Sequence, residues 1–317
     1  MKKRMSHQLH KEIMRIGTRA SLLALRQANW VKARVEEQNP GVEVTLVHIK
    51  TQGDKIEVPL FQMGGKGLFV KEIEESLLSD EIDLAVHSAK DLPILIPEGL
   101  ALIAFPERED PRDALISKGE RLWADIPLGG KVGTSSLRRQ AQLLNLRPDL
   151  EIVPLRGNLD TRINKLLTLN LDAIILASAG LRRMGWEKRV TECFEPEVML
   201  PAIGQGVIAI EARLKDKRIE HLVASLNHPP TQLCFMAERA FLQRLGGGCQ
   251  VPIAGLAEMA LGRLKLRALV AATDGREVIR GEIEGPSSQG ELLGKGLAEE
   301  LLGKGASDIL KEVEKRG

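Results

Sequence analysis

Hydrophobic positions in the first two-thirds of the chain switch repeatedly between strand-like and helix-like spacing. Residues 13–18 are typical of a short strand, and the apolar residues Ala24, Ala28, Val31 and Val35 that follow have the spacing of one helix face. The pattern predicts further strands at residues 42–46, 82–86, 131–134, 151–155 and 172–177 and helices at residues 70–77, 137–144, 159–166 and 179–185. This alternation predicts an α/β protein with a doubly wound, largely parallel sheet in each of two domains.

The last third of the chain has a different pattern. Every second residue from Leu264 to Val270 is apolar, Asp274-Gly275 favours a hairpin turn, and the alternation resumes at Ile279. A helical stretch interrupted by glycines ends the chain. These features predict a small C-terminal α+β domain.

Composition narrows the class of protein. A length of 317 residues favours two or three domains. Aromatic residues make up 3% of the chain and the formal net charge is +2, so we expect no nucleic-acid partner. No stretch is long and apolar enough for a membrane span, and the polar start at residues 1–11 does not match a signal peptide. We therefore expect a cytoplasmic protein that does not bind membranes.

Three cysteines, Cys193, Cys234 and Cys249, lie far apart, and none belongs to a CxxC pair. An odd number of separated cysteines suits a reducing compartment, and the six histidines lack metal-site spacing, so no metal is expected. Cys249 follows three consecutive glycines, which leave its thiol unshielded by neighbouring side chains. We expect Cys249 to be accessible and the other two cysteines to serve packing.

Ser, Thr and Arg recur where predicted strands give way to helices. They do so at residues 18–21, at residues 134–139, and at residues 156–158 together with Arg162. A helix N-terminus attracts anions, and an arginine fork matches a carboxylate. One such turn would be read as a helix cap on a solvated face. Three turns at the carboxyl ends of strands favour a polyanionic ligand.

A fourth segment, residues 87–93, follows another predicted strand and contains Lys90 and Asp91. The two charges form either a solvated pair of little energetic value or part of a cleft lined by cations. In such a cleft Asp91 would stay ionised and could stabilise a cation or relay a proton. Spacing alone does not decide between these roles.

Nine segments in order resemble the hydroxymethylbilane synthase (porphobilinogen deaminase) family, over nearly the whole chain from about residue 15. The segments are IGTRASLLALRQA, GGKGLFVKEIE, IDLAVHSAKDLP, EREDPRDAL, VGTSSLRRQAQL, LRGNLDTR, DAIILASAGLRRMG, LPAIGQGVIAIE and AERAFLQRLGGGCQVPIAG. The resemblance implies two domains like periplasmic anion-binding proteins, with the active cleft between them, and a third domain that carries the cysteine. We expect residues 12–106 with 207–224 in the first domain, 112–200 in the second and 229–317 in the third, after a disordered lead-in at residues 1–11.

The resemblance also implies the chemistry. A dipyrromethane cofactor would be attached by a thioether to Cys249, and four porphobilinogen molecules would add to it in turn, each losing ammonia, before water releases hydroxymethylbilane. Asp91 would be the catalytic carboxylate that stabilises the cationic azafulvene. The residues implied for the cofactor, besides Cys249, are Lys90, Thr134, Ser136, Arg138, Arg139 and Arg156. Those implied for the substrate are Arg19, Ser21, Lys66, Phe69, Arg162 and Arg183. The resemblance would place a lysine where this chain has Gln62. We expect the protein to be a monomer.

Two other classes share part of this pattern. A small-anion binding module would use the two α/β domains without needing Cys249 or a third domain. A cysteine-dependent hydrolase would need a histidine beside its thiol, and none lies near Cys249 in sequence.

Overall fold

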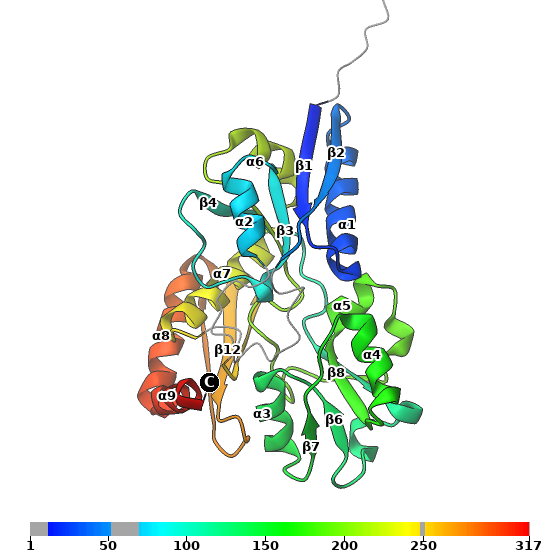
Figure 1. Cartoon of the computed structure of the whole chain (residues 1–317). Coiled ribbons are helices and arrows are strands. Elements are labelled where there is room, and N and C mark those ends of the chain that lie inside the picture. Colours follow the sequence, from blue (N-terminus) through cyan, green and yellow to red (C-terminus); the bar gives the residue numbers. More distant parts are fainter. Residues whose placement is uncertain (1–11, 52–69, 248–250, 317) are drawn as a thin grey trace, which may run out of the picture.

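The computed structural model describes residues 12–51, 70–247 and 251–316 and arranges them around three sheets (Figure 1). Two five-stranded sheets, each with helices beside it, form the upper and lower right parts of the view, and a three-stranded sheet lies at the lower left. The predicted fold class, two α/β domains and a small α+β domain, is confirmed.

The first sheet has the strand order β2-β1-β3-β10-β4. Its strands are β1 (Glu12–Thr18), β2 (Val42–His48), β3 (Leu84–Ser88), β4 (Leu100–Ala104) and β10 (Ile208–Arg213). The helices α1 (Leu22–Gln38), α2 (Lys71–Leu78) and α6 (Lys217–Val223) pack beside it. β1 is parallel to β2 and β3, whereas β10 runs antiparallel to β3 and β4. Residues far apart in the chain thus complete one sheet.

The second sheet has the order β7-β6-β8-β5-β9. Its strands are β5 (Asp113–Ser117), β6 (Lys131–Gly133), β7 (Glu151–Val153), β8 (Ala173–Ala177) and β9 (Glu192–Cys193), and its helices are α3 (Leu137–Leu146), α4 (Leu159–Thr168) and α5 (Ser178–Arg183). Here β5 is antiparallel to both of its neighbours. Each sheet therefore contains one antiparallel strand, and β5 and β10 are the first strands after the two crossings between these domains.

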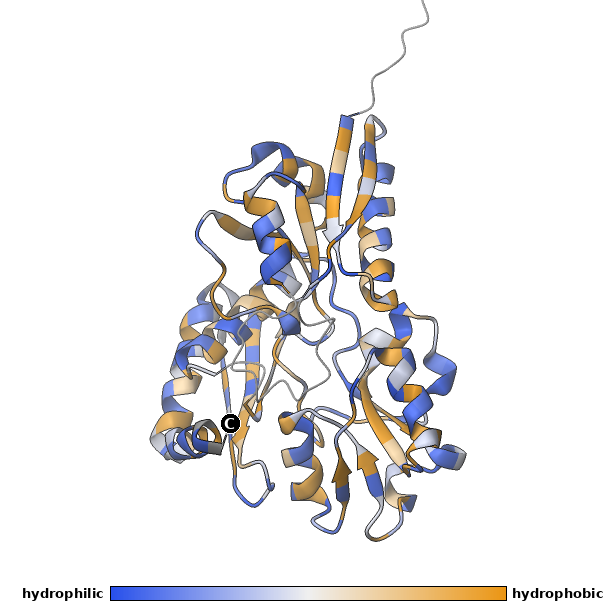
Figure 2. Cartoon of the chain, in the orientation of Figure 1, coloured by the Kyte–Doolittle hydropathy of each residue, from blue (hydrophilic) through white to orange (hydrophobic). Residues whose placement is uncertain are grey.

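The third sheet is an antiparallel meander flanked by helices. It comprises β11 (Ile253–Ala260), β12 (Arg263–Ala271) and β13 (Val278–Pro286), with α7 (Pro229–Arg244), α8 (Gly290–Leu301) and α9 (Ser307–Arg316). The predicted hairpin is confirmed, because Ala271 pairs with Val278 across the turn that holds Gly275. Figure 2 shows apolar residues concentrated along the strands and hydrophilic residues on the outer faces of the helices.

Short turns connect these elements. The 3₁₀ turns are η3 (Ala89–Asp91), η4 (Lys118–Glu120), η5 (Trp123–Asp125), η6 (Glu187–Arg189), η7 (Ala224–Leu226) and η8 (Ser287–Gln289), and a π turn, η9 (Leu302–Ala306), joins α8 to α9.

The loop between β12 and β13 is hydrogen-bonded to α3, the helix whose first turn holds Arg138 and Arg139. The side chain of Gln140 donates to the carbonyl of Thr273 at 3.1 Å, and Asn145 donates to the carbonyl of Gly275 at 2.9 Å. Gly275 has φ +73°, and a Cβ there would lie 2.5 Å from the backbone nitrogen of Asn145. Glycine is therefore required at the tip of the hairpin.

Candidate active site

Two adjoining pockets lie where the first and second domains meet, and both are lined by Leu23 and Ser88. The first pocket has an empty volume of about 470 Å³ and takes its lining from both domains. The second has an empty volume of about 490 Å³ and is lined by residues of the first domain. Together they form the candidate active site.

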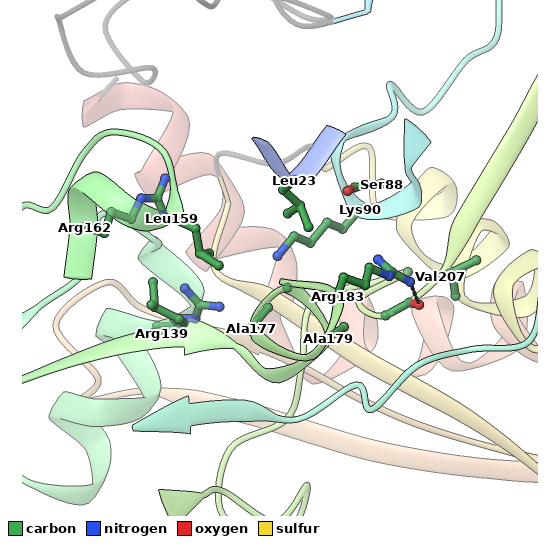
Figure 3. A pocket seen from close by; sticks show the side chains of 14 residues that line it. Leu23, Ser88, Lys90, Arg139, Leu159, Arg162, Ala177, Ala179, Arg183 and Val207 are labelled. Atoms are coloured by element: carbon green, nitrogen blue, oxygen red, sulfur yellow. Dashed lines mark hydrogen bonds between the residues drawn. The ribbon is translucent and has the colours of Figure 1, made fainter. Parts of the chain in front are cut away.

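Four cationic side chains line the first pocket: Lys90, Arg139, Arg162 and Arg183. Lys90 reaches from the first domain towards the side on which Arg139 and Arg162 lie (Figure 3). Arg139 lies in the first turn of α3, Arg162 on α4 and Arg183 at the end of α5. The topology thus gathers positive charge from four separate elements, as an anionic ligand requires.

The burial of these charged groups together lowers their pKa values. Burial lowers the pKa of Lys90 to about 8, with Arg139 and Arg138 adding to the effect and Asp91 opposing it. Burial also lowers the pKa of Arg162 and that of Arg183 to about 10. A bound anion would favour the charged forms of these buried groups, so the pocket favours carboxylates.

A buried aspartate holds two of the predicted arginines. Asp113 Oδ2 accepts from Arg138 Nη1 at 2.6 Å, and Asp113 Oδ1 accepts from Arg139 Nη2 at 2.7 Å. Burial by itself would raise the pKa of Asp113, but the two guanidinium charges outweigh it and hold that pKa well below its usual range. Asp113 is therefore ionised and fixes the first turn of α3.

Arg138 and Arg139 have different surroundings although they are adjacent. Arg138 Nη1 also donates to the carbonyl of Leu200 at 2.9 Å, and Arg138 does not line either pocket. Arg139 Nη1 donates to the carbonyl of Ile175 at 2.9 Å, yet its side chain borders the first pocket. The geometry brings Arg139 into the site and places Arg138 behind it.

The side chains of Thr134 and Ser136 bond to the local backbone, whereas the charge of Arg156 acts on Arg162. Ser136 Oγ accepts from the backbone nitrogen of Arg139 at 3.4 Å as the N-cap of α3, and Thr134 Oγ1 accepts from that of Ser136 at 3.2 Å. The carbonyl of Arg156 accepts from Lys165 Nζ at 3.1 Å. Thr134, Ser136 and Arg156 line neither pocket.

The second pocket contains the remaining predicted residues that the structure describes. Arg19, Ser21 and Asp91 all line it. Ser21 caps α1, where its Oγ accepts from the backbone nitrogen of Ala24 at 3.4 Å. Asp91 is exposed at the end of η3, next to Lys90, so its carboxylate is accessible to a ligand that spans both pockets.

Besides Asp113, the buried polar residues His87, Gln205 and Glu211 at this site were not predicted from the sequence. His87 lines the second pocket, and its Nε2 lies 2.8 Å from Glu211 Oε2. Gln205 connects Lys90 to Asp113. His87 lies in the segment that contains Asp91 and could have been noticed, whereas nothing local distinguishes Gln205 or Glu211.

Lys66, Phe69, Gln62 and Cys249 lie outside the described residues. Cys234 is 6% exposed in α7, where burial raises the pKa of its thiol to about 12, and this agrees with the packing role expected of it. Cys193 lies in β9 with its Sγ 3.9 Å from Ser178 Oγ. Across residues 12–51, 70–247 and 251–316 no cluster of His, Cys, Asp and Glu is arranged to hold a metal, and none of the helices formed there could cross a membrane.

Comparison with known proteins extends these observations. The family model "Porphobilinogen deaminase, dipyromethane cofactor binding domain" matches residues 14–221, and "Porphobilinogen deaminase, C-terminal domain" matches residues 232–303. The porphobilinogen deaminase of Pelobacter propionicus is 58% identical over 277 residues, which are 87% of this chain and 89% of that protein. The one of Geotalea uraniireducens is 55% identical over 304 residues, covering 96% of this chain and 95% of its own length.

Solved structures give weaker likenesses. The methionine-binding protein MetQ aligns at 14% identity and a TM-score of 0.42 over 68% of this chain and 88% of its own. The probable amino-acid transporter binding protein ytmK of Bacillus subtilis aligns at 10% identity and a TM-score of 0.43, over 68% of this chain and 90% of its own. The two family models and the relatives above, by contrast, extend along most of the sequence. The chain belongs to the porphobilinogen deaminase family.

Proposed function

We propose that this chain is a hydroxymethylbilane synthase, which condenses four porphobilinogen molecules head to tail on a dipyrromethane primer attached to Cys249. The supporting observation is the pair of joined pockets, where Lys90, Arg139, Arg162 and Arg183 surround one space and Asp91 borders the next. Cationic groups for carboxylates and one accessible carboxylate for a developing cation are what this reaction needs.

The cations bind and orient the substrate. Each porphobilinogen carries an acetate and a propionate, so every added ring brings two negative charges into the cleft. Arg139, Arg162 and Arg183 offer planar forks for bidentate binding, and Lys90 supplies a compact charge. Loss of one such contact to a desolvated carboxylate costs about 2–5 kcal/mol.

The residues present suit the cofactor that the family model names. Arg139 and Lys90 face the pocket with lowered pKa values that an anionic group would restore. When bound, dipyrromethane supplies the pyrrole carbon to which the first substrate is joined. Thr134, Ser136 and Arg138 then act by holding the first turn of α3, and with it Arg139, in place. Arg156, whose charge acts on Arg162, adds a further cation for the cofactor. Lys66, Phe69, Arg19 and Ser21 complete the substrate contacts.

Asp91 acts on the reacting atoms of the substrate. In each addition the C–N bond to the aminomethyl group breaks, ammonia leaves, and a C–C bond forms as the accepting pyrrole carbon loses its proton. The ionised Asp91 stabilises the substrate cation left when ammonia departs and accepts that proton. After four additions the C–C bond between the primer and the first added ring would break. The primer carbon would regain a proton, and water would supply the hydroxyl group of the released hydroxymethylbilane.

Intact mass and peptide mapping test the attachment. The purified chain should carry two linked pyrroles on Cys249, seen also as colour with an acidic aldehyde reagent after acid precipitation. Cys193→Ala and Cys234→Ala serve as controls and should keep both adduct and turnover. An unmodified Cys249 in protein that consumes porphobilinogen normally would overturn the assignment. We also propose that the protein is cytoplasmic and monomeric. Light scattering measures its mass in solution and so tests the oligomeric state.

The same experiments separate the two alternative classes. An anion-binding module would bind porphobilinogen without consuming it, and a cysteine hydrolase would carry no pyrrole adduct. Either result would replace the synthase assignment.

A further inference from the structure

The side chain of Gln205 lies at the junction of the first and second domains and is 0% exposed. It belongs to the segment that returns from the second domain to β10. Gln205 Nε2 donates to Asp113 Oδ1 at 3.0 Å and to the carbonyl of Pro111 at 2.7 Å, while Gln205 Oε1 accepts from Lys90 Nζ at 3.3 Å. One amide therefore touches the lysine of one domain and the aspartate of the other.

The chemistry of the partners fixes the orientation of this amide. The carboxylate of Asp113 and the carbonyl of Pro111 can only accept hydrogen bonds, so the amide nitrogen must face them. The ammonium of Lys90 can only donate, so the amide oxygen must face Lys90. A flipped amide would lose all three contacts.

The backbone around Gln205 is held equally firmly. The carbonyl of Gln205 accepts from Arg108 Nε at 2.8 Å, and the carbonyl of Gly206 accepts from Arg183 Nη2 at 2.6 Å. Gly206 has φ +87°, and a Cβ there would lie 2.3 Å from the carbonyl oxygen of Glu109. Gln205 thus projects from a rigid support, and the same support fixes Arg183.

A neutral amide suits this place for an electrostatic reason. It gives Lys90 a hydrogen-bond acceptor without cancelling the lysine charge, which stays available to a ligand carboxylate. It also completes the hydrogen bonding of Asp113, which orients Arg139 on the opposite wall of the pocket. A carboxylate here would compete with the ligand for Lys90, and an apolar side chain would leave Pro111 and Asp113 with fewer donors.

We propose that Gln205 is a positioning residue that aims the ammonium of Lys90 into the first pocket and couples its place to that of Arg139 through Asp113. The inference rests on the proposed function in so far as Lys90 and Arg139 bind carboxylates of the primer and substrate. Its consequence is that the two domains present their cations at a fixed separation, which selects ligands with carboxylates at matching spacing.

Two substitutions with opposite expected effects test this role. Gln205→Met keeps the length of the side chain but removes the acceptor, so the charged form of Lys90 is less favoured and the pKa of Lys90 falls. Gln205→Glu supplies a carboxylate, so the pKa of Lys90 rises. A change of about one pH unit in each direction is expected from one hydrogen bond to a charged group. The charged groups around Lys90 in wild type are Asp91, Asp113, Arg138 and Arg139.

The measurement is competitive acetic anhydride labelling of the full-length chain across pH, with modification of Lys90 quantified by peptide mass. Gln142→Met is the matched control. Gln142 is also 0% exposed and bonds both to the nitrogen and to the carbonyl of Leu200, at 2.8 and 2.9 Å, but it does not touch Lys90. This variant should lose stability and leave the labelling midpoint of Lys90 unchanged.

Opposite shifts in the two Gln205 variants, absent from Gln142→Met, support the proposal. Shifts of the same sign, or no shift, would show that Gln205 only fills space. If Gln205→Glu does not fold, the comparison of Gln205→Met with Gln142→Met decides alone. Porphobilinogen consumption by the wild-type chain is measured in parallel, and its absence would reject the proposed function without touching the labelling result.

Discussion

Arg139 donates two hydrogen bonds to one oxygen of Asp113, from Nε at 3.0 Å and from Nη2 at 2.7 Å. Asp113 is 0% exposed and also receives Arg138. Two arginines sharing one aspartate contribute a single net positive charge to the site. Arg139 borders the first pocket and Arg138 does not, so this net charge reaches a ligand through Arg139.

Asp113→Asn should strongly destabilise the second domain, because two buried guanidinium groups would lose their counter-charge. The expected loss in the free energy of unfolding is about 3–5 kcal/mol. Urea denaturation of the purified chain measures it. Asp149→Asn is a suitable control, since Asp149 pairs with Arg147 beyond the other end of α3 in an exposed position, and its stability should stay near that of wild type. Equal stability of the two variants would contradict the assigned role of Asp113.

Replacing the adjacent arginines should affect cofactor loading differently, although each variant also loses a buried ion pair with Asp113. Arg139→Leu removes a side chain that lines the pocket, so purified protein should carry little dipyrromethane by intact mass. Arg138→Leu removes a side chain behind the pocket and should mainly lower stability, leaving a larger loaded fraction. A loaded Arg139→Leu beside an empty Arg138→Leu would reverse this assignment.

The sequence predicted most of the elements because their apolar residues have clear periodicity. The helix face at Ala28, Val31 and Val35 is buried as expected, and so is the alternation in β12. The pattern did not identify β4, β5 and β10. β5 is a short strand that is buried at every position, so local spacing does not reveal it. β10 pairs with β3, which lies about 120 positions away in the chain, and local spacing does not reveal that partner either.

The site was predictable where function depends on residue type and not where it depends on long-range pairing. Arginines at strand ends pointed to anions, and Arg139, Arg162 and Arg183 do line one pocket. The distinction between Arg138 and Arg139 depends on Asp113, which lies 25 residues from Arg138 in sequence. That partner becomes visible only when the sheet brings β5 beside the first turn of α3.

Glu74 should make stability depend on pH. It is buried in α2, its Oε1 has no hydrogen-bond partner within the described part of the chain, and burial together with the charge of Glu211 raises its pKa from 4.5 to about 7. The folded state then holds a proton that the unfolded state has released, so stability falls as pH rises from 4.5 to 7. Glu74→Gln should raise the free energy of unfolding at pH 8 by roughly 2 kcal/mol.

Thermal unfolding at pH 5 and pH 8 tests this prediction. Glu74→Gln should differ little from wild type at the lower pH and unfold at a higher temperature at the upper pH. Glu98→Gln is the control, because Glu98 has an exposed side chain outside α2 and does not contribute to the raised pKa of Glu74, so it should show no such gain. If the Glu74→Gln variant were less stable than wild type at both pH values, the folded protein would require the ionised carboxylate of Glu74.

Asp91 should be required for turnover and dispensable for folding. It is exposed at the end of η3 and lines the second pocket with Arg19 and Ser21, so Asp91→Asn keeps the shape and leaves the core untouched. Without the charge, the substrate cation is less stabilised and proton removal lacks a base, so turnover should fall by at least about a hundredfold. Asp91→Glu keeps the charge in a shifted place and should retain more activity than Asp91→Asn.

Asp125 is an exposed aspartate at the end of another 3₁₀ turn, η5, and lines neither pocket. Asp125→Asn is therefore the control and should turn over like wild type. Steady-state rates together with the masses of the enzyme-bound intermediates measure these effects, and near-normal turnover by Asp91→Asn with its primer in place would return Asp91 to the role of a solvated surface charge.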